Sequence, residues 1–148
     1  MSIQADLIVY DPLDHPKTII EIKSKRKTSD GWASQLLRNL LAHGFLIEPE
    51  FFVVITIDRI YLWKNNNHSN PTNSIPTCSV DTKSIWQQYT SKDELSGPFI
   101  DGKSFELIVF NWLRDINSTR TGELSANLPT VLMEALRGKI LLSEVRPG

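Results

Sequence analysis

The sequence predicts an α/β fold, more specifically an α+β arrangement in which helices flank a mixed β-sheet. Three observations lead to this class. Two short segments rich in β-forming residues are joined by a turn, a segment with helical spacing follows them, and an unbroken apolar run comes next. A helix that links two neighbouring strands indicates a right-handed crossover and a parallel pair. The 148 residues are a typical length for one domain with a real core.

The first two strands form a hairpin. Residues 6–10, "DLIVY", are rich in β-formers and predict the first strand. Residues 11–17, "DPLDHPK", carry two prolines and two aspartates, which is typical of a turn. Residues 18–24, "TIIEIKS", then predict the second strand. We therefore expect these two strands to pair in antiparallel fashion.

A helix follows the hairpin, with Ser29 or Asp30 as its cap, and it runs to about His43 before Gly44. Residues 51–57, "FFVVITI", predict a strand covered on both faces, because such strands have few polar positions. Residues 60–64, "IYLWK", predict a returning strand. The step from the second strand through the helix to this buried strand is the expected crossover.

The chain divides into three parts. Residues 1–64 hold the hairpin, the helix and the next two strands. Residues 65–77, "NNNHSNPTNSIPT", are a loop or linker with little to bury. Residues 78–148 are expected to be mainly helical and to pack on the same domain. They contain an amphipathic helix behind Ser104 that extends to Ile116, a helix between Pro129 and Gly138, and a candidate last strand at 139–145.

Composition and charge exclude several classes of protein. No apolar run approaches the roughly 18 residues that cross a bilayer, so no membrane partner is expected. The first residues have neither the basic nor the apolar region of a signal peptide. Cys78 is the only cysteine, which excludes an internal disulfide and fits a cytoplasmic location. The net charge of −1 provides no general basic field, so any contact with nucleic acid requires a local patch.

The second strand carries two charges where a buried sheet is expected. Side chains alternate along a strand, so Glu21 and Lys23 share one face. In the hairpin, Asp6 lies opposite this region. A turn over 12–15 pairs Asp6 with Glu21, and a turn over 12–17 pairs it with Lys23. Both registers bring two carboxylates and one ammonium group together on one face.

This cluster has a chemical use and a simpler alternative. Two carboxylates suit Mg²⁺ or Mn²⁺, which can polarise a phosphodiester and activate water, and a neighbouring lysine can position that water. Alternatively, Glu21 and Lys23 form a surface pair on a solvated sheet face and Asp6 merely begins a strand. The chain has two other Asp-x-Lys tripeptides, at 81–83 and 101–103, and neither follows a hairpin.

Residues 5–25, "ADLIVYDPLDHPKTIIEIKSK", resemble the signature of the PD-(D/E)xK nuclease superfamily, which has the restriction-endonuclease-like fold. The resemblance covers residues 5–64 and implies such a core with flanking helices. It implies that Asp6 and Glu21 bind Mg²⁺ or Mn²⁺, with the carbonyl of Ile22 as a candidate third ligand. It implies that Lys23 is catalytic and that Gln35, on the following helix, supports the site. The implied activity is cleavage of DNA, of restriction or repair type.

The chain departs from the family pattern at its start. The family fold usually begins with a helix and a strand before the Asp, the helix often carries a further acidic residue, and only five residues precede Asp6 here. We expect the segments 104–116 or 139–145, or a second chain, to take those places. A longer gene product is the other explanation.

A second function class stays open beside the nuclease. The chain can keep the nuclease fold without cleavage and act as a binding module. Its helix behind Ser104 would then dock a partner subunit or a second copy of the chain.

A basic run follows the second strand. Lys23, Lys25 and Lys27 would share one face of an extended segment, with Arg26 between them. Such a face attracts a nucleic-acid backbone, and it equally serves as a solubilising exit from the strand. The histidines and the cysteine show no spacing typical of a zinc site.

Overall fold

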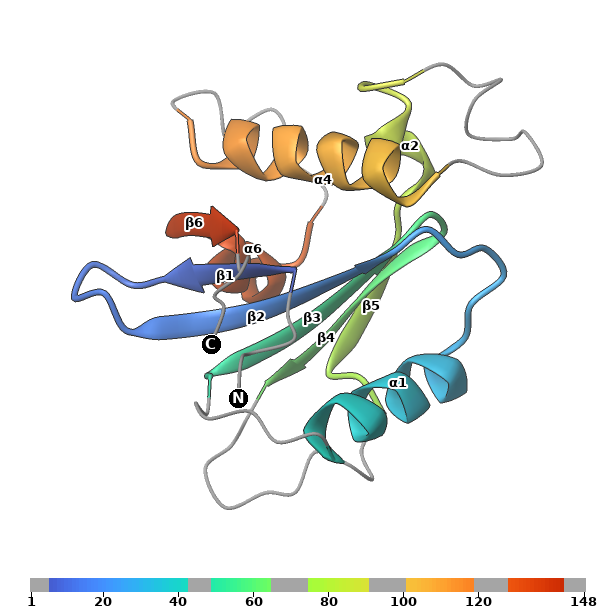
Figure 1. Ribbon diagram of the computed structural model, residues 1–148, viewed down its shortest axis with the longest axis horizontal. Helices are drawn as coiled ribbons and strands as arrows, with labels where there is room; N and C mark the ends of the chain where they lie inside the picture. Colours follow the sequence, from blue (N-terminus) through green and yellow to red (C-terminus); the bar gives the residue numbers. More distant parts are fainter. Residues whose placement is uncertain (1–5, 43–48, 65–74, 91–100, 119–127, 143–148) are drawn as a thin grey trace.

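The computed structural model describes residues 6–42, 49–64, 75–90, 101–118 and 128–142 (Figure 1). Within them, six strands form one mixed sheet in the order β5-β4-β3-β2-β1-β6. The strands are β1 (Leu7–Tyr10), β2 (Pro16–Lys23), β3 (Phe51–Thr56), β4 (Arg59–Lys64), β5 (Cys78–Asp81) and β6 (Lys139–Leu142). The helices are α1 (Asp30–Ala42), α2 (Lys83–Trp86), α4 (Gly102–Ile116) and α6 (Thr130–Leu136). This architecture confirms the predicted mixed α/β class.

The hairpin and the crossover are both present. Strands β1 and β2 pair antiparallel, and β2 and β3 pair parallel with α1 between them in the chain. All other neighbouring strands are antiparallel. Ser29 caps α1, because its hydroxyl accepts a hydrogen bond from the backbone N–H of Trp32 at 3.1 Å. The expected helix end at residues 43 and 44 lies outside the described residues.

The sheet buries both of its faces. Helix α4 lies on one side of the sheet and α1 on the other (Figure 1). The larger core lies between the sheet and α2, α4 and α6, and it includes Val9, Ile20, Ile55, Trp86, Phe105 and Trp112. The smaller core lies under α1 and contains Ile19, Ala33, Leu37, Phe52, Val54, Tyr61 and Trp63. Burial of β3 on both faces explains its unbroken apolar sequence.

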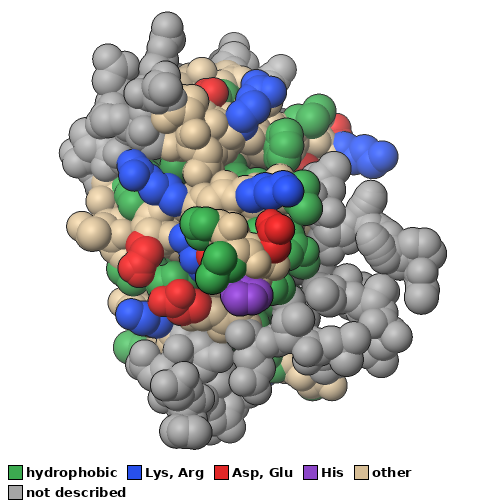
Figure 2. Space-filling model, turned by 90° about the vertical axis from the view of Figure 1, so that its left-hand side faces the viewer, with side chains coloured by type: hydrophobic (Ala, Val, Ile, Leu, Met, Phe, Trp, Pro, Cys, Tyr) green, Lys and Arg blue, Asp and Glu red, His purple; other side chains and the backbone are tan. Residues whose placement is uncertain are grey.

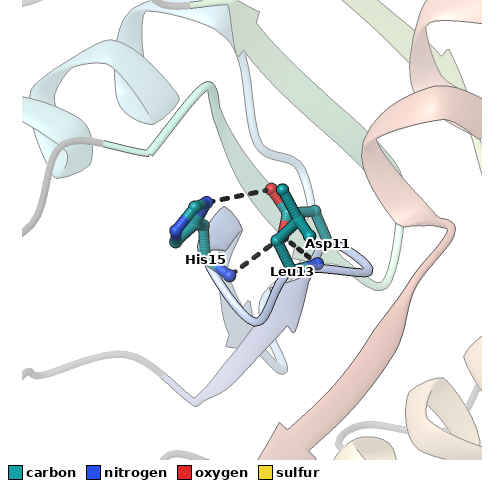
Figure 3. A network of polar contacts seen from close by, with 3 residues as sticks. All are labelled: Asp11, Leu13 and His15. Carbon is teal, nitrogen blue, oxygen red and sulfur yellow. Dashed lines mark hydrogen bonds and ion pairs between the residues drawn. The ribbon is translucent and has the colours of Figure 1, made fainter.

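The turn of the hairpin is held by one carboxylate (Figure 3). Oδ1 of Asp11 accepts hydrogen bonds from the backbone N–H groups of Leu13 and His15, both at 2.9 Å. Its Oδ2 lies 3.6 Å from Nδ1 of His15. Asp14 takes a φ of 65°, a conformation that Asp tolerates in turns. These bonds close the turn and thereby fix how β1 and β2 are paired.

The second half of the chain differs from the prediction at two points. Helix α4 begins at Gly102 rather than behind Ser104, because Asp101 caps it and accepts from the N–H groups of Lys103 and Ser104 at 2.9 and 3.1 Å. Strand β5 lies in a region expected to be mainly helical, where it pairs with β4. The last predicted strand is confirmed as β6, which pairs with β1. Among the helices of the described segments, none is both long and apolar enough to cross a membrane.

Candidate active site

The hairpin register places Asp6 next to Glu21. Leu7 is paired with Ile20, so the next residues outward on the two chains are Asp6 and Glu21, which is the pairing that the shorter predicted turn gives. The turn itself differs from that prediction, because Tyr10 pairs with Pro16 and the register shifts between Val9 and Tyr10. The backbone N–H of Asp6 donates to the carbonyl oxygen of Ile20 at 3.1 Å. Its side-chain Oδ2 accepts from the backbone N–H of Ile22 at 2.7 Å. Asp6 therefore binds β2 on both sides of Glu21.

Glu21 is a buried acid with only one of its oxygens bonded. Its exposed fraction is 7%. Oε2 lies 3.0 Å from Nζ of Lys23, whose side chain is 43% exposed. Oε1 is shielded from solvent and has no hydrogen-bond partner among the described residues. An ionised oxygen in such a position costs free energy, which a proton or a cation would offset.

Burial raises the pKa of both acids, and at Glu21 the negative charge of Asp6 adds to this effect. Burial, followed by the negative charge of Asp6, raises the pKa of Glu21 to about 7, although Lys23 opposes this shift. Burial also raises the pKa of Asp6, while the bond from Ile22 and the charge of Lys23 act in the opposite direction. Raised carboxylate pKa values beside a lysine are characteristic of functional sites.

Helix α4 contributes a third acid, Glu106, which sequence reasoning did not identify. Its charge is one of the causes that raise the pKa of Glu21. Burial and the charge of Asp6 in turn raise the pKa of Glu106. Helix α4 passes close to the end of β2, where a Cβ added to Gly102 would lie 3.9 Å from Oγ of Ser24. The only feature of the sequence that could have indicated Glu106 is that this helix carries an acid in its first two turns.

Both segments named as candidates for the missing first helix and strand lie against the hairpin. Helix α4 packs against β2. Strand β6 pairs with β1 over its four residues, from Leu7 with Leu142 to Tyr10 with Lys139. Both segments therefore contact the hairpin over the parts that the structure describes, and their equivalence to the first helix and strand of the family fold stays a prediction.

Few of the described side chains near Asp6 and Glu21 could act as metal ligands. The part of the chain that the structure describes contains no group of three or more His, Cys, Asp or Glu side chains that could hold a metal ion. The cluster thus offers two carboxylates, Asp6 and Glu21, to a cation. Mg²⁺ is commonly bound through one or two carboxylates and keeps several waters. The buried, unpartnered Oε1 of Glu21 is the observation that fits such an ion.

For two residues of the predicted site, Gln35 and Ile22, the structure gives no contact that indicates a role in metal binding or catalysis. Gln35 is exposed on α1, where its Oε1 accepts from Arg38 at 2.6 Å and its Nε2 donates to Asn39 at 3.3 Å. These bonds run along the helix, so its supporting role stays a prediction from the resemblance. The N–H of Ile22 bonds Asp6, and the role of its carbonyl as a third ligand also stays a prediction.

The basic run after β2 is bent, and the expectation of an extended segment is wrong. The N–H of Lys25 donates to the carbonyl of Lys23 at 2.8 Å, which closes a tight turn. Lys27 has a φ of 54°, and its N–H donates to the carboxylate of Asp58. These turns separate the three lysines from a common strand face.

The other Asp-x-Lys tripeptides differ from the cluster in their surroundings. Asp101 caps α4, and Asp81 is an exposed residue at the end of β5. Comparison of the chain with protein-family models, with curated proteins and with solved structures finds no match. The functional argument therefore depends on the geometry of the Asp6, Glu21 and Lys23 side chains.

Proposed function

We propose that this protein is a Mg²⁺- or Mn²⁺-dependent nuclease that hydrolyses DNA phosphodiester bonds, of restriction or repair type. One observation carries the proposal. A buried glutamate, Glu21, has one oxygen on Lys23 and one that no described residue bonds, and a second carboxylate, Asp6, is fixed beside it. Such a pair of acids with an adjacent lysine supports metal-assisted phosphoryl chemistry.

The three side chains have separable roles. Asp6 and Glu21 would hold the ion, which polarises the phosphodiester and lowers the pKa of a water molecule when bound. The bond from Ile22 fixes one oxygen of Asp6, so this carboxylate is oriented before any ligand arrives. Lys23 has three N–H donors, of which Glu21 takes one. Its partly exposed ammonium group can use the others to orient the attacking water or to stabilise charge on phosphoryl oxygens.

The test is cleavage by variants that stay folded. Lys23→Ala is expected to reduce DNA cleavage at least about 100-fold with Mn²⁺ or Mg²⁺ present, because it removes the charge beside the reacting phosphoryl group. The chain offers a matched control in Lys83→Ala, which removes the same residue type from another tripeptide. Circular dichroism checks the fold. Undiminished cleavage by Lys23→Ala would overturn the assignment.

The alternative is a module with the same fold that binds a partner and does not cut. The ion pair at 3.0 Å favours it, because Lys23 partly compensates Glu21 without any metal. Leu107, 64% exposed on α4, gives this helix an apolar contact for a partner subunit or a second copy. Calorimetric titration with Mn²⁺ separates the two functions. The nuclease binds the ion through Glu21, and the interaction module shows no difference between the wild type and Glu21→Gln.

A further inference from the structure

Arg26 holds a buried nitrogen without an acceptor. One terminal guanidinium nitrogen, Nη2, is shielded from solvent and has no hydrogen-bond partner in the described part of the chain. The side chain as a whole is only partly buried. A guanidinium group is always charged and presents five N–H donors in a planar fork. A charged donor without an acceptor is unfavourable, so this side chain gains free energy when an anion becomes available.

The surrounding chain does not supply that anion. The acid that contacts this bend is Asp58, and its carboxylate accepts from the backbone N–H of Lys27 rather than from Arg26. The neighbours in the sequence, Lys25 and Lys27, are exposed and carry the same charge as Arg26. The bend therefore places two lysines beside a guanidinium group whose donors are incompletely used.

The bend lies at the same end of the hairpin as the acidic cluster. Strand β2 ends at Lys23, and its C-terminal end lies on the side of the molecule away from the hairpin turn (Figure 1). The face at the left of that view, where the turn lies, carries acidic and basic side chains interspersed (Figure 2). Arg26 follows Lys23 by three residues, a reach of at most about 10 Å.

We propose that Arg26 is a positioning residue that binds a backbone phosphate of the DNA strand, within about three nucleotides of the phosphate at Lys23. The proposal rests on the proposed nuclease function. The planar fork of Arg26 matches two oxygens of one phosphate, and Lys25 and Lys27 add attraction without that geometry. In the free protein one guanidinium nitrogen of Arg26 is shielded from solvent, so the side chain would move outward to reach the phosphate.

The experiment measures DNA binding without cleavage. A fluorescein-labelled DNA oligonucleotide is titrated with wild-type protein in EDTA at several salt concentrations. We expect Arg26→Ala to weaken binding about tenfold or more and to reduce the slope of log K against log salt by about one. Arg26→Lys, which keeps the charge and loses the fork, is expected to recover the slope and only part of the affinity.

The matched control is Arg38→Ala. This arginine is exposed on α1 and bonds Gln35, so its loss removes the same charge away from the bend. We expect its binding constant and salt slope to stay close to those of the wild type. Thermal unfolding is recorded for every variant. If Arg26→Ala does not fold, Arg26→Lys with an affinity equal to that of the wild type overturns the proposal.

The outcomes separate this proposal from the nuclease assignment. DNA binding that depends on Arg26, without cleavage under any metal condition, supports the phosphate contact and ends the nuclease assignment. Cleavage that depends on Lys23, with wild-type binding and salt slope in Arg26→Ala, retains the nuclease and overturns the phosphate contact. Arg26→Ala with a lowered melting temperature and an unchanged salt slope shows a structural role and also overturns it. A wild-type protein that binds no DNA overturns both.

Discussion

The two ends of the β1–β2 hairpin hold carboxylates in opposite conditions. At the turn, Asp11 is partly exposed and accepts two backbone N–H groups. The bond from His15 is the main cause that lowers its pKa. At the other end, Glu21 is buried, one of its oxygens lacks a partner, and its pKa is raised to about 7. Two acids of one supersecondary unit thus differ in every property that decides ionisation.

The difference distinguishes Asp11, which stabilises the turn through hydrogen bonds, from Glu21, whose burial does not stabilise the fold in this way. Asp11 closes a turn with local backbone donors, as acids in turns commonly do. Glu21 contributes no comparable bond to the backbone, and its burial destabilises the ionised form. A buried acid that Lys23 compensates at only one of its two oxygens is a candidate for binding or catalysis.

The largest effect we expect is on catalysis. Glu21→Gln keeps the size of the side chain and removes the charge that would hold the cation, so cleavage should fall at least about 100-fold. Asp11→Asn, at the opposite end of the same hairpin, should cut at nearly the wild-type rate. Cleavage of labelled DNA in Mn²⁺ gives both rates. Loss of activity in Asp11→Asn with full activity in Glu21→Gln would show that Asp11, and not Glu21, is the functional acid of the hairpin.

The next largest effect is on the free energy of unfolding. We expect removal of the charge to stabilise the protein at Glu21 and to destabilise it at Asp11. The pKa of Glu21 is raised from 4.5 to about 7. The folded protein therefore holds this proton more tightly than the unfolded chain does. Its stabilising contribution is complete below pH 4.5 and is lost as the pH rises through 7. In EDTA at pH 8, Glu21→Gln should be more stable than the wild type by about 3 kcal/mol, a figure that already includes the opposing effect of Lys23 on the pKa.

The stability measurement is urea unfolding from pH 4 to pH 8. The difference between Glu21→Gln and the wild type should disappear at the acidic end of this range. Asp11 has a lowered pKa, so its contribution is present at neutral pH and is lost as the pH falls through that pKa. Asp11→Asn should therefore be less stable than the wild type at pH 7. A variant Glu21→Gln that is less stable than the wild type at pH 8 would contradict the described burial.

The smallest effect we expect comes from the third acid. Glu106→Gln removes a negative charge that raises the pKa of Glu21, so the midpoint of Glu21 should move to lower pH. The affinity for Mn²⁺ should fall by less than about fivefold, because Glu106 is mostly exposed and acts at a distance. Asp11 should titrate as before. Carboxyl-carbon NMR of a labelled sample follows all three acids, and an unmoved Glu21 would exclude electrostatic contact with α4.

Much of the sheet could be predicted because its strands carry strong local patterns. The β-rich pair, the turn between them and the apolar run at 51–57 each specify one element, and the helix between them specifies a parallel neighbour. Strand β5 was missed for a physical reason. Its sequence, "CSVD", is short and half-exposed at the edge of the sheet, so it lacks the apolar alternation of a core strand.

The site was predictable only as far as strand geometry extends. Alternation along β2 and the antiparallel pairing of the hairpin place Asp6, Glu21 and Lys23 together, but the register shift between Val9 and Tyr10 was not predicted. Glu106 depends on how α4 packs on a strand that lies far from it in the sequence. The orphaned nitrogen of Arg26 depends on a bend that no periodicity encodes. Tertiary packing therefore decides which charges around the hairpin lack a partner.

The position of β1 affects when this architecture can be completed during synthesis. This strand, which follows directly after Asp6, lies between β2 and β6, and its Leu7 is paired with Leu142. A nascent chain can close the hairpin as soon as 7–23 emerge, but β1 has an open edge until 139–142 leave the ribosome. Contacts of such long sequence separation form late and slowly. The growing polypeptide therefore carries an unprotected strand edge between the synthesis of β1 and that of β6, and chaperones that cover such edges should bind it in that interval.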